Sequence, residues 1–268
     1  MGDSYTDPYF VGDRFVTVRK NPYNVTVRYR ATGRLIGRLE LPDLTARTGH
    51  PLLENGPRAL PVARDGPKLV MTDGWYYLMV DTDRMVIDWK RLIDAKDATR
   101  EPAMRFALKG GYLAVLKEDY DKKTIYMLSS KTGDVLWRTD PKDAKSPQPL
   151  HSMYIEGEHI HGIGVYAGQG FYYVKRECKT GRLLYQTTVK GYGGRPAATL
   201  VPWNYNGRAI VQVKDRQHFE LNVFDMKTGE RLDALKKKGV GEFGRHGNVS
   251  GAVQNGRIVM LSKDRLDL

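Results

Sequence analysis

One short pattern recurs along the sequence at a regular spacing, and this repeat limits the possible folds more than any other feature. The pattern is seen in "RYRATGRLIG" at 28–37, "SSKTGDVLW" at 129–137, "RECKTGRLLY" at 176–185 and "FDMKTGERLD" at 224–233. Thr132, Thr180 and Thr228 follow one another at intervals of 48 residues. A period of roughly 40 to 50 residues is typical of a propeller or another repeat array.

A fifth, degenerate copy fills the gap between Thr32 and Thr132. It is "DTDRMVIDW", which ends at Trp89, 48 residues before Trp137. Arg84 and Met85 stand there in place of Thr-Gly. A second marker, a glycine turn followed by an apolar strand, keeps the same phase in "RDGPKLVM", "KGGYLAVL" and "NGRAIVQV". Because the two markers recur with the same period, we conclude that the repeat did not arise by chance.

Each repeat divides into four short strands, as the third repeat illustrates. Its strands are expected near 104–108, 112–117, 124–129 and 135–139, in segments rich in β-branched and aromatic residues. The Thr-Gly pair lies in the hairpin between the last two strands, where glycine can adopt a positive φ and the threonine hydroxyl can bond nearby backbone. The predicted turn residues are Thr32, Gly33, Thr132, Gly133, Thr180, Gly181, Thr228 and Gly229.

The fold class expected from this pattern is all-β, a β-propeller of four-stranded antiparallel blades. Five full blades are expected at 8–42, 58–94, 103–140, 150–190 and 197–238, within a single propeller domain or propeller segment over 1–268. Residues 249–268 are expected to supply the first two strands of a sixth, partial blade. The chain is then either a segment of a longer or split propeller, or a small ring of five or six blades with irregular closure.

A large residue on the outermost strand is expected to pack between neighbouring blades. Three repeats place an aromatic residue at this position, namely Trp89, Trp137 and Tyr185, whereas the first and fifth place Gly37 and Asp233 there. We therefore predict interblade packing at the three aromatic residues.

The repeat resembles the PQQ-like, quinoprotein-type propeller repeat, in which an Asp, a Thr-Gly pair and a Trp recur. "LSSKTGDVLW" at 128–137 is the most similar copy, and "FDMKTGERL" at 224–232 keeps the aspartate as Asp225. The resemblance covers nearly the whole chain and implies the fold more strongly than an activity, because the family includes dehydrogenases, assembly scaffolds and binding domains.

The residues that the resemblance implies for quinone chemistry are not all present. Family dehydrogenases use an adjacent Cys-Cys pair, a calcium site and a catalytic aspartate, whereas this chain has one cysteine, Cys178. We therefore expect no cofactor, and PQQ with calcium is disfavoured. No catalytic residue is assigned, and the sequence leaves open whether the chain is an enzyme, with the missing cofactor pair weighing against it.

The histidines at 159 and 161 form one candidate site. They are two residues apart on a predicted strand, so both rings are expected on one face, where they could bind a divalent metal ion. His159 and His161 could equally contact a partner or be ordinary strand residues.

Loops between the blades carry the other candidates. Arg195 in "KGYGGRP" could contribute charge to a partner contact, and Trp203 and Tyr205 in "PWNYN" could supply rigid aromatic surface. A structural role as linker and packing residues is the alternative for each.

Three functions follow from these patterns. The first is a non-catalytic scaffold that binds a protein or a glycan partner, and the second is a quinoprotein oxidoreductase or a fragment of one. The third is a polyanion-binding propeller, because 43 basic and 31 acidic residues give a net charge of +12, although the charge is spread along the chain. No transmembrane segment or signal peptide is predicted, and the family resemblance implies a periplasmic or extracellular location.

Overall fold

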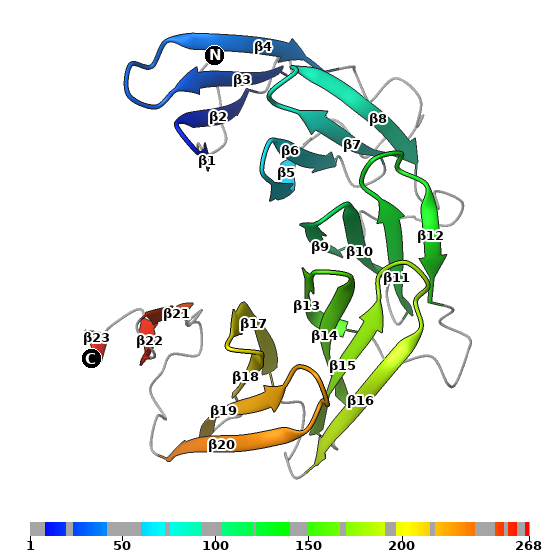
Figure 1. Cartoon of the computed structure of the whole chain (residues 1–268), viewed down its shortest axis with the longest axis vertical. Coiled ribbons are helices and arrows are strands. Elements are labelled where there is room, and N and C mark those ends of the chain that lie inside the picture. Colours follow the sequence, from blue (N-terminus) through cyan, green and yellow to red (C-terminus); the bar gives the residue numbers. More distant parts are fainter. Residues whose placement is uncertain are drawn as a thin grey trace. The chain divides into compact units, whose positions relative to one another are not determined.

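The structure is built from β-strands and tight turns. The computed structural model describes residues 9–19, 24–41, 60–72, 76–92, 103–119, 122–139, 150–166, 170–190, 197–214, 218–238, 250–254, 257–261 and 266–267. Within these ranges no residue is helical. The strands form five four-stranded antiparallel sheets and one three-stranded sheet (Figure 1). The predicted all-β architecture, with five full blades and a partial one, is confirmed.

Each of the first three sheets is a blade whose strands follow one another in chain order. Blade 1 contains β1 (Tyr9–Val11), β2 (Arg14–Arg19), β3 (Asn24–Tyr29) and β4 (Leu35–Glu40). Blade 2 contains β5 (Leu60–Asp65), β6 (Lys68–Thr72), β7 (Tyr76–Asp81) and β8 (Val86–Leu92). Blade 3 contains β9 (Ala103–Lys109), β10 (Tyr112–Asp119), β11 (Lys122–Ser129) and β12 (Val135–Arg138).

The remaining sheets continue the same order. Blade 4 contains β13 (Leu150–Glu156), β14 (His159–Tyr166), β15 (Gly170–Glu177) and β16 (Leu183–Lys190). Blade 5 contains β17 (Ala197–Tyr205), β18 (Arg208–Lys214), β19 (His218–Asp225) and β20 (Arg231–Lys238). The last sheet contains β21 (Ser250–Gln254), β22 (Arg257–Leu261) and β23 (Leu266–Asp267). The short β23 corrects the expectation that only two strands follow residue 249.

The chain divides into two compact units. The first comprises Met1–Pro141 with Ile155–Glu158 and Cys178–Thr180, and the second comprises Lys142–Tyr154, His159–Glu177 and Gly181–Leu268. The first unit therefore holds blades 1 to 3 and two turns of blade 4. The second unit holds the strands that follow.

In the first unit the middle strands of blade 2 contribute to two cores. Leu69 and Leu78 pack with the valines of β2 and β3, whereas Tyr77 and Met79 pack with Leu113 and other residues of blade 3. Successive residues of a strand point to opposite faces, so both faces of this sheet are covered. The middle strands of blade 2 are therefore apolar without alternation, as in "YYLMV" at 76–80.

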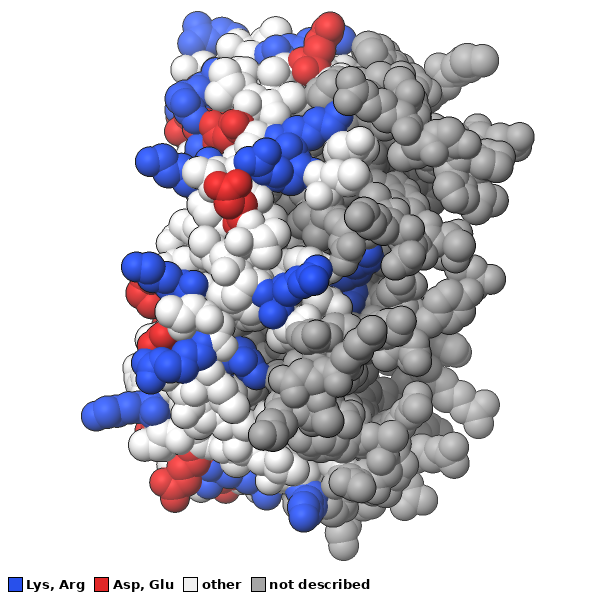
Figure 2. Space-filling model, turned by 90° about the vertical axis from the view of Figure 1, so that its right-hand side faces the viewer, with Lys and Arg blue, Asp and Glu red and all other residues white. Residues whose placement is uncertain are grey.

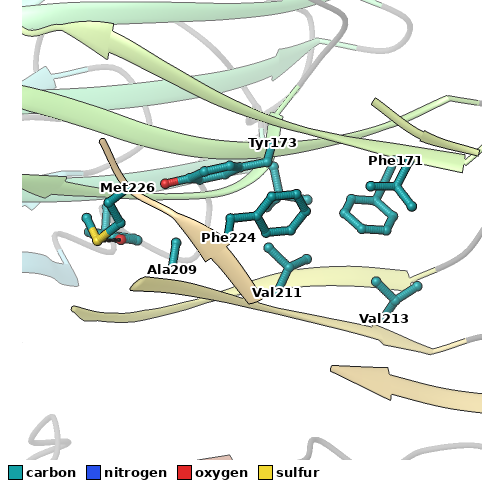
Figure 3. Packing of buried hydrophobic residues seen from close by; sticks show 10 residues of the cluster. Phe171, Tyr173, Ala209, Val211, Val213, Phe224 and Met226 are labelled. Carbon is teal, nitrogen blue, oxygen red and sulfur yellow. Dashed lines mark hydrogen bonds between the residues drawn. The ribbon is translucent and has the colours of Figure 1, made fainter. Parts of the chain in front are cut away.

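In the second unit an aromatic core joins blades 4 and 5. Phe171 and Tyr173 of β15 pack against Phe224 of β19, with ring centroids 6.2 and 4.9 Å from that of Phe224. Val211 of β18 and Met226, which follows β19, belong to the same cluster (Figure 3). All three aromatic rings are fully buried. Burial of such large apolar surfaces is the main stabilising contribution to this core.

The outermost strand of each four-stranded blade contains a β-bulge close to its turn. In blade 3 the pairing register shifts so that Leu128 faces Val135 and Met127 faces Trp137, which leaves Leu136 without an opposite residue. The same shift occurs at the start of β4, β8, β16 and β20. A bulge re-aims the side chain that follows it and disturbs the exposed edge of a sheet. In blades 2, 3 and 4 the residue after the bulge is Trp89, Trp137 or Tyr185, and its side chain reaches the next blade.

Candidate functional site

The four Thr-Gly turns share one geometry. In each, the glycine N–H donates to the carbonyl oxygen four residues earlier, at distances of 2.8 to 3.0 Å. The glycine φ values are positive, 66° at Gly33, 73° at Gly133 and Gly181, and 77° at Gly229. The hydroxyls of Thr32, Thr132 and Thr228 accept the backbone N–H two residues further on, at 3.2 to 3.3 Å. Thr and Gly therefore each stabilise the turn in a distinct way.

The three outer-strand aromatic residues reach from their own blade to the Thr-Gly turn of the next one. Trp89 Nε1 donates to the Ser130 carbonyl oxygen at 2.7 Å, and Trp137 Nε1 donates to the Cys178 carbonyl oxygen at 2.7 Å. Tyr185 Oη donates to the Met226 carbonyl oxygen at 2.9 Å. In all three cases donor and acceptor lie 41 residues apart in sequence. We call this contact the aromatic latch.

The turn glycine makes room for the latch. A Cβ atom placed on Gly133 would lie 2.7 Å from the Trp89 ring, and one placed on Gly229 would lie 2.4 Å from the Tyr185 ring. Any larger residue would push the ring away from its carbonyl partner. The glycine is therefore required by backbone conformation and by the neighbouring blade together.

Blade 2 uses a different turn, held by a carboxylate. Asp81 accepts the backbone N–H groups of Asp83 and Arg84 at 2.9 and 3.0 Å, the Arg84 Nε–H at 2.8 Å, and Lys68 Nζ at 2.9 Å. Lys68 also donates to Asp88 at 2.5 Å. Burial alone would raise the pKa of Asp81, but these hydrogen bonds outweigh it and hold the pKa well below its usual range. Among the described residues of this turn, the charge network replaces the role of the missing threonine.

The structure places His161 in the core of the second unit. Its Nδ1 lies 2.7 Å from Tyr173 Oη, and its ring is stacked with that of Tyr154 at a centroid distance of 5.1 Å. Burial, together with the charges of Lys175 and His159, lowers the pKa of His161 to about 3. His161 is therefore a neutral core residue at physiological pH, and one of its ring nitrogens is engaged with a tyrosine.

The metal site predicted at His159 and His161 stays a prediction. His159 is half-buried on the same strand. Within the described ranges, no group of three or more His, Cys, Asp or Glu side chains is arranged to hold a metal ion. Cys178 is buried, and burial raises the pKa of its thiol to about 12.

The predicted loop contacts are only partly described. Arg195 lies outside the described residues. Trp203 and Tyr205 belong to the described backbone of β17, whereas their side chains lie outside the described part of the structure. Their role in partner contact therefore stays a prediction.

An open groove lies between the outer strands of blades 2 and 3, and sequence reasoning missed it. Its volume is about 480 Å³, and Arg91 and Leu92 of β8 line one side. Tyr126 of β11 and Val135, Trp137 and Arg138 of β12 line the remainder. No pattern in the sequence pointed to it, since the groove depends on the spacing between two adjacent sheets.

An ion pair spans one end of this groove. Arg91 Nη2 donates to the Thr132 carbonyl oxygen at 3.2 Å and to Asp134 Oδ1 at 3.0 Å. The pKa of Asp134 is lowered, first by the Thr132 hydroxyl and then by the charge of Arg91. Arg91 therefore crosses from blade 2 to the turn of blade 3 beside the latch of Trp89.

Basic and acidic side chains are interspersed on the face that contains this region. In Figure 1 β8 and β12 lie on the right-hand side, which faces the viewer in Figure 2. There, blue Lys and Arg side chains alternate with red Asp and Glu and with uncharged surface. Among the described residues no helix could span a membrane.

The comparisons with known proteins concern the fold. No protein-family model and no curated protein sequence matches the chain. Among solved structures, it is similar to the Dos1 propeller, with a TM-score of 0.57 and 12% identity over 96% of this chain and 65% of that chain. It is also similar to a europium-containing methanol dehydrogenase, with a TM-score of 0.53 and 12% identity over 85% of this chain and 50% of that chain.

A third match is BamB from Moraxella catarrhalis, with a TM-score of 0.42 and 12% identity over 94% of this chain and 79% of that chain. The chain thus spans less than two thirds of the Dos1 propeller and of the methanol dehydrogenase. At this level of identity the likeness to those two structures shows the fold alone. That fold is a β-propeller.

Proposed function

We propose that this chain is a non-catalytic β-propeller scaffold that binds a protein partner through the outer strands of its blades. One observation carries the proposal. Of the eight large hydrophobic residues that are exposed among the described side chains, seven lie on outermost strands. These seven are Leu35, Val86, Leu92, Val135, Leu136, Leu183 and Leu232.

The position of these residues within the blade repeats. Leu35, Val135 and Leu183 each come two residues after the turn glycine, and their exposed fractions are 48%, 49% and 44%. Single exposed apolar residues are normal on a protein surface, but apolar residues gathered on one kind of element suggest an interaction surface. Their burial by a partner would remove apolar area from water and so favour binding.

The latches support a scaffold role because they fix the strands that carry these residues. The outer strands β8, β12 and β16 are tied to the following blade by Trp89, Trp137 and Tyr185. A surface that is ordered before binding loses less conformational entropy when a partner binds. We extend the proposal to a periplasmic or extracellular location on the family resemblance alone.

A site-specific crosslinking experiment tests this function. A photoreactive amino acid is placed at Leu35, Leu136 or Leu183 in the chain expressed in its native source, with Lys131 and Lys227, which are exposed in Thr-Gly turns, as matched positions. The proposal predicts protein adducts of discrete mass from the outer-strand positions and none from the turn positions. Equal labelling at both kinds of position, or no adducts, would contradict it.

Two further measurements separate the competing functions. Saturable binding of PQQ with calcium, together with dye-linked alcohol oxidation, would replace the scaffold by an oxidoreductase. Binding to heparin or DNA that weakens steeply with salt would instead indicate a polyanion site. The scaffold proposal predicts neither.

A further inference from the structure

The groove between β8 and β12 combines apolar surface with positive charge. Leu92, Val135 and Leu136 are exposed along it, whereas Tyr126 is buried at its base and the indole of Trp137 reaches blade 4. Two arginines and one aspartate are the charged residues that line it, which leaves a formal charge of +1. Its volume of about 480 Å³ lies within the range of ligand-binding pockets.

From this we propose that the groove binds an extended acidic segment of a partner protein, which inserts at least one large apolar side chain. The inference rests on the proposed scaffold function and names the chemistry of its partner. Arg138 and Arg91 would face the carboxylates of the segment. The aliphatic lining would cover its apolar residue.

The geometry of Arg91 favours a carboxylate partner. Its side chain is about half exposed, and both of its hydrogen bonds to described residues use Nη2. The ion pair with Asp134 holds the guanidinium group in place across the groove. A guanidinium group has five N–H donors in a planar fork, so its remaining donors suit a second carboxylate.

The position of β12 favours a peptide over a glycan. It is the last strand in its sheet, and within the described residues it pairs only with β11. The outer edge of such a strand presents backbone N–H and C=O groups that an extended peptide can pair with. The residues of this edge, Val135–Arg138, are the same residues that line the groove.

The charge of the whole chain acts in the same direction. With a net charge of +12, the protein attracts acidic partners at long range and repels basic ones. The groove would then select among acidic partners by the apolar residue that it accommodates.

The experiment uses the full chain and three probes. These are a labelled peptide that alternates leucine and glutamate, the same peptide with lysine in place of glutamate, and a heparin oligosaccharide, all measured by fluorescence anisotropy. The groove predicts saturable binding of the acidic peptide only. Binding of the lysine peptide with equal strength, binding of heparin in its place, or no binding of the acidic peptide would overturn the proposal.

The chain provides a matched control for the charge. Arg138 is five residues after Gly133, and Arg38 is five residues after Gly33 on the outer strand of blade 1. Arg138→Glu should weaken binding of the acidic peptide by about tenfold or more, the effect of replacing one charge-assisted contact by repulsion. Arg38→Glu should leave it unchanged, and the lysine peptide should gain affinity for Arg138→Glu.

Several outcomes of this comparison are informative. Equal weakening by Arg138→Glu and Arg38→Glu would show attraction to overall charge and would overturn the groove. Circular dichroism and the thermal midpoint confirm that both variants fold. If crosslinks form at Leu35 and Leu183 but the acidic peptide does not bind, the groove fails while the scaffold function stands. If neither crosslinks nor binding of the acidic peptide is observed, both the scaffold function and the groove proposal fail.

Discussion

The side chain of Met85 occupies the space in front of Gly37 that an aromatic latch would otherwise fill. A Cβ atom placed on Gly37 would lie 2.8 Å from Met85 Cγ. Gly37 stands at the latch position of blade 1, and Met85 stands at the turn-glycine position of blade 2, where its φ of 55° is positive. The two residues have therefore exchanged roles, with the small residue on the outer strand and the large one in the turn.

This exchange predicts a strong coupling between the two positions. Gly37→Trp alone would place a ring against Met85, and overpacking of this kind costs about 1 to 3 kcal/mol. Met85→Gly alone relieves the backbone strain of a positive φ, but it removes the side chain that packs against Gly37. In the double variant the usual ring-and-glycine arrangement is restored, so the coupling energy should be favourable by about 0.5 to 3 kcal/mol.

Urea unfolding of the four proteins in this cycle measures the coupling. The control combines Gly37→Trp with Arg84→Ala. Arg84 is next to Met85 in the turn, but the three atoms nearest to a Cβ on Gly37 all belong to Met85. If the changes in unfolding free energy caused by Gly37→Trp and Met85→Gly simply added, the two positions would not be coupled. That result would contradict the exchange of roles.

A pair of glycines in blade 5 separates backbone strain from latch packing. Gly207 and Gly229 have nearly equal φ values of 73° and 77°. A Cβ atom on Gly207 would meet nothing within 4 Å, whereas one on Gly229 would lie 2.4 Å from the Tyr185 ring. Gly207→Ala should lower the free energy of unfolding by about 1 to 2 kcal/mol, the cost of a positive φ.

Gly229→Ala should lower the free energy of unfolding by about 1 to 3 kcal/mol more than Gly207→Ala does, because the ring of Tyr185 must move. Thermal or urea unfolding of both variants provides the comparison. Equal destabilisation by the two substitutions would show that the ring of Tyr185 does not lie against the turn.

Burial of His161 predicts a loss of stability in mild acid. Because the folded-state pKa is lowered to about 3, the unfolded chain binds a proton that the folded chain does not. Stability from the neutral ring is fully present above the unfolded pKa of about 6.5 and decreases as the pH falls toward the folded pKa, by at most about 1.4 kcal/mol per pH unit.

Urea unfolding between neutral pH and pH 5 measures this dependence, with His161→Phe as the comparison. The variant should lose the part of the pH dependence that His161 contributes. A histidine ring that titrates near its ordinary pKa by NMR would rule out the buried placement.

Removal of the Asp81 charge should strongly destabilise blade 2. Asp81→Asn keeps the side-chain size but loses the charge that accepts from Arg84 and Lys68, and a hydrogen bond to a charged group typically contributes about 1.5 to 3 kcal/mol. Asp134→Asn is the control, since Asp134 is an exposed carboxylate paired with Arg91 at 3.0 Å. Solvent screens an exposed pair, so it contributes little to stability. Similar losses in the two variants by urea unfolding would contradict a structural role for the buried network.

The sequence predicts the architecture well because the repeat is encoded locally. Thr-Gly turns need a residue with positive φ and a short hydroxyl side chain, and both can be recognised in the sequence without knowledge of distant contacts. The spacing of Thr132 and Thr180 then determines where blades begin and end. The predicted strands of blade 3 agree with β9 to β12 to within two residues.

The features that the sequence did not predict depend on contacts between blades. The partner of Trp89 is a backbone carbonyl group, which carries no side-chain signature in the sequence. The pairing of Gly37 with Met85 looks like two separate departures from the repeat until the blades are placed side by side. The bulge at Leu136 and the groove beside Trp137 likewise arise from strand register and sheet spacing.

The central claim is that blades 2, 3 and 4 are each fastened to the next blade by an aromatic side chain of the outer strand. Hydrogen exchange at the indole N–H groups of Trp89 and Trp137, followed by NMR, tests it most directly. Both groups donate to backbone carbonyl oxygens at 2.7 Å, so the account predicts slow exchange for both, with protection of Trp89 lost in Gly133→Ala. Exchange at the rate of an exposed indole in the wild-type chain would contradict it.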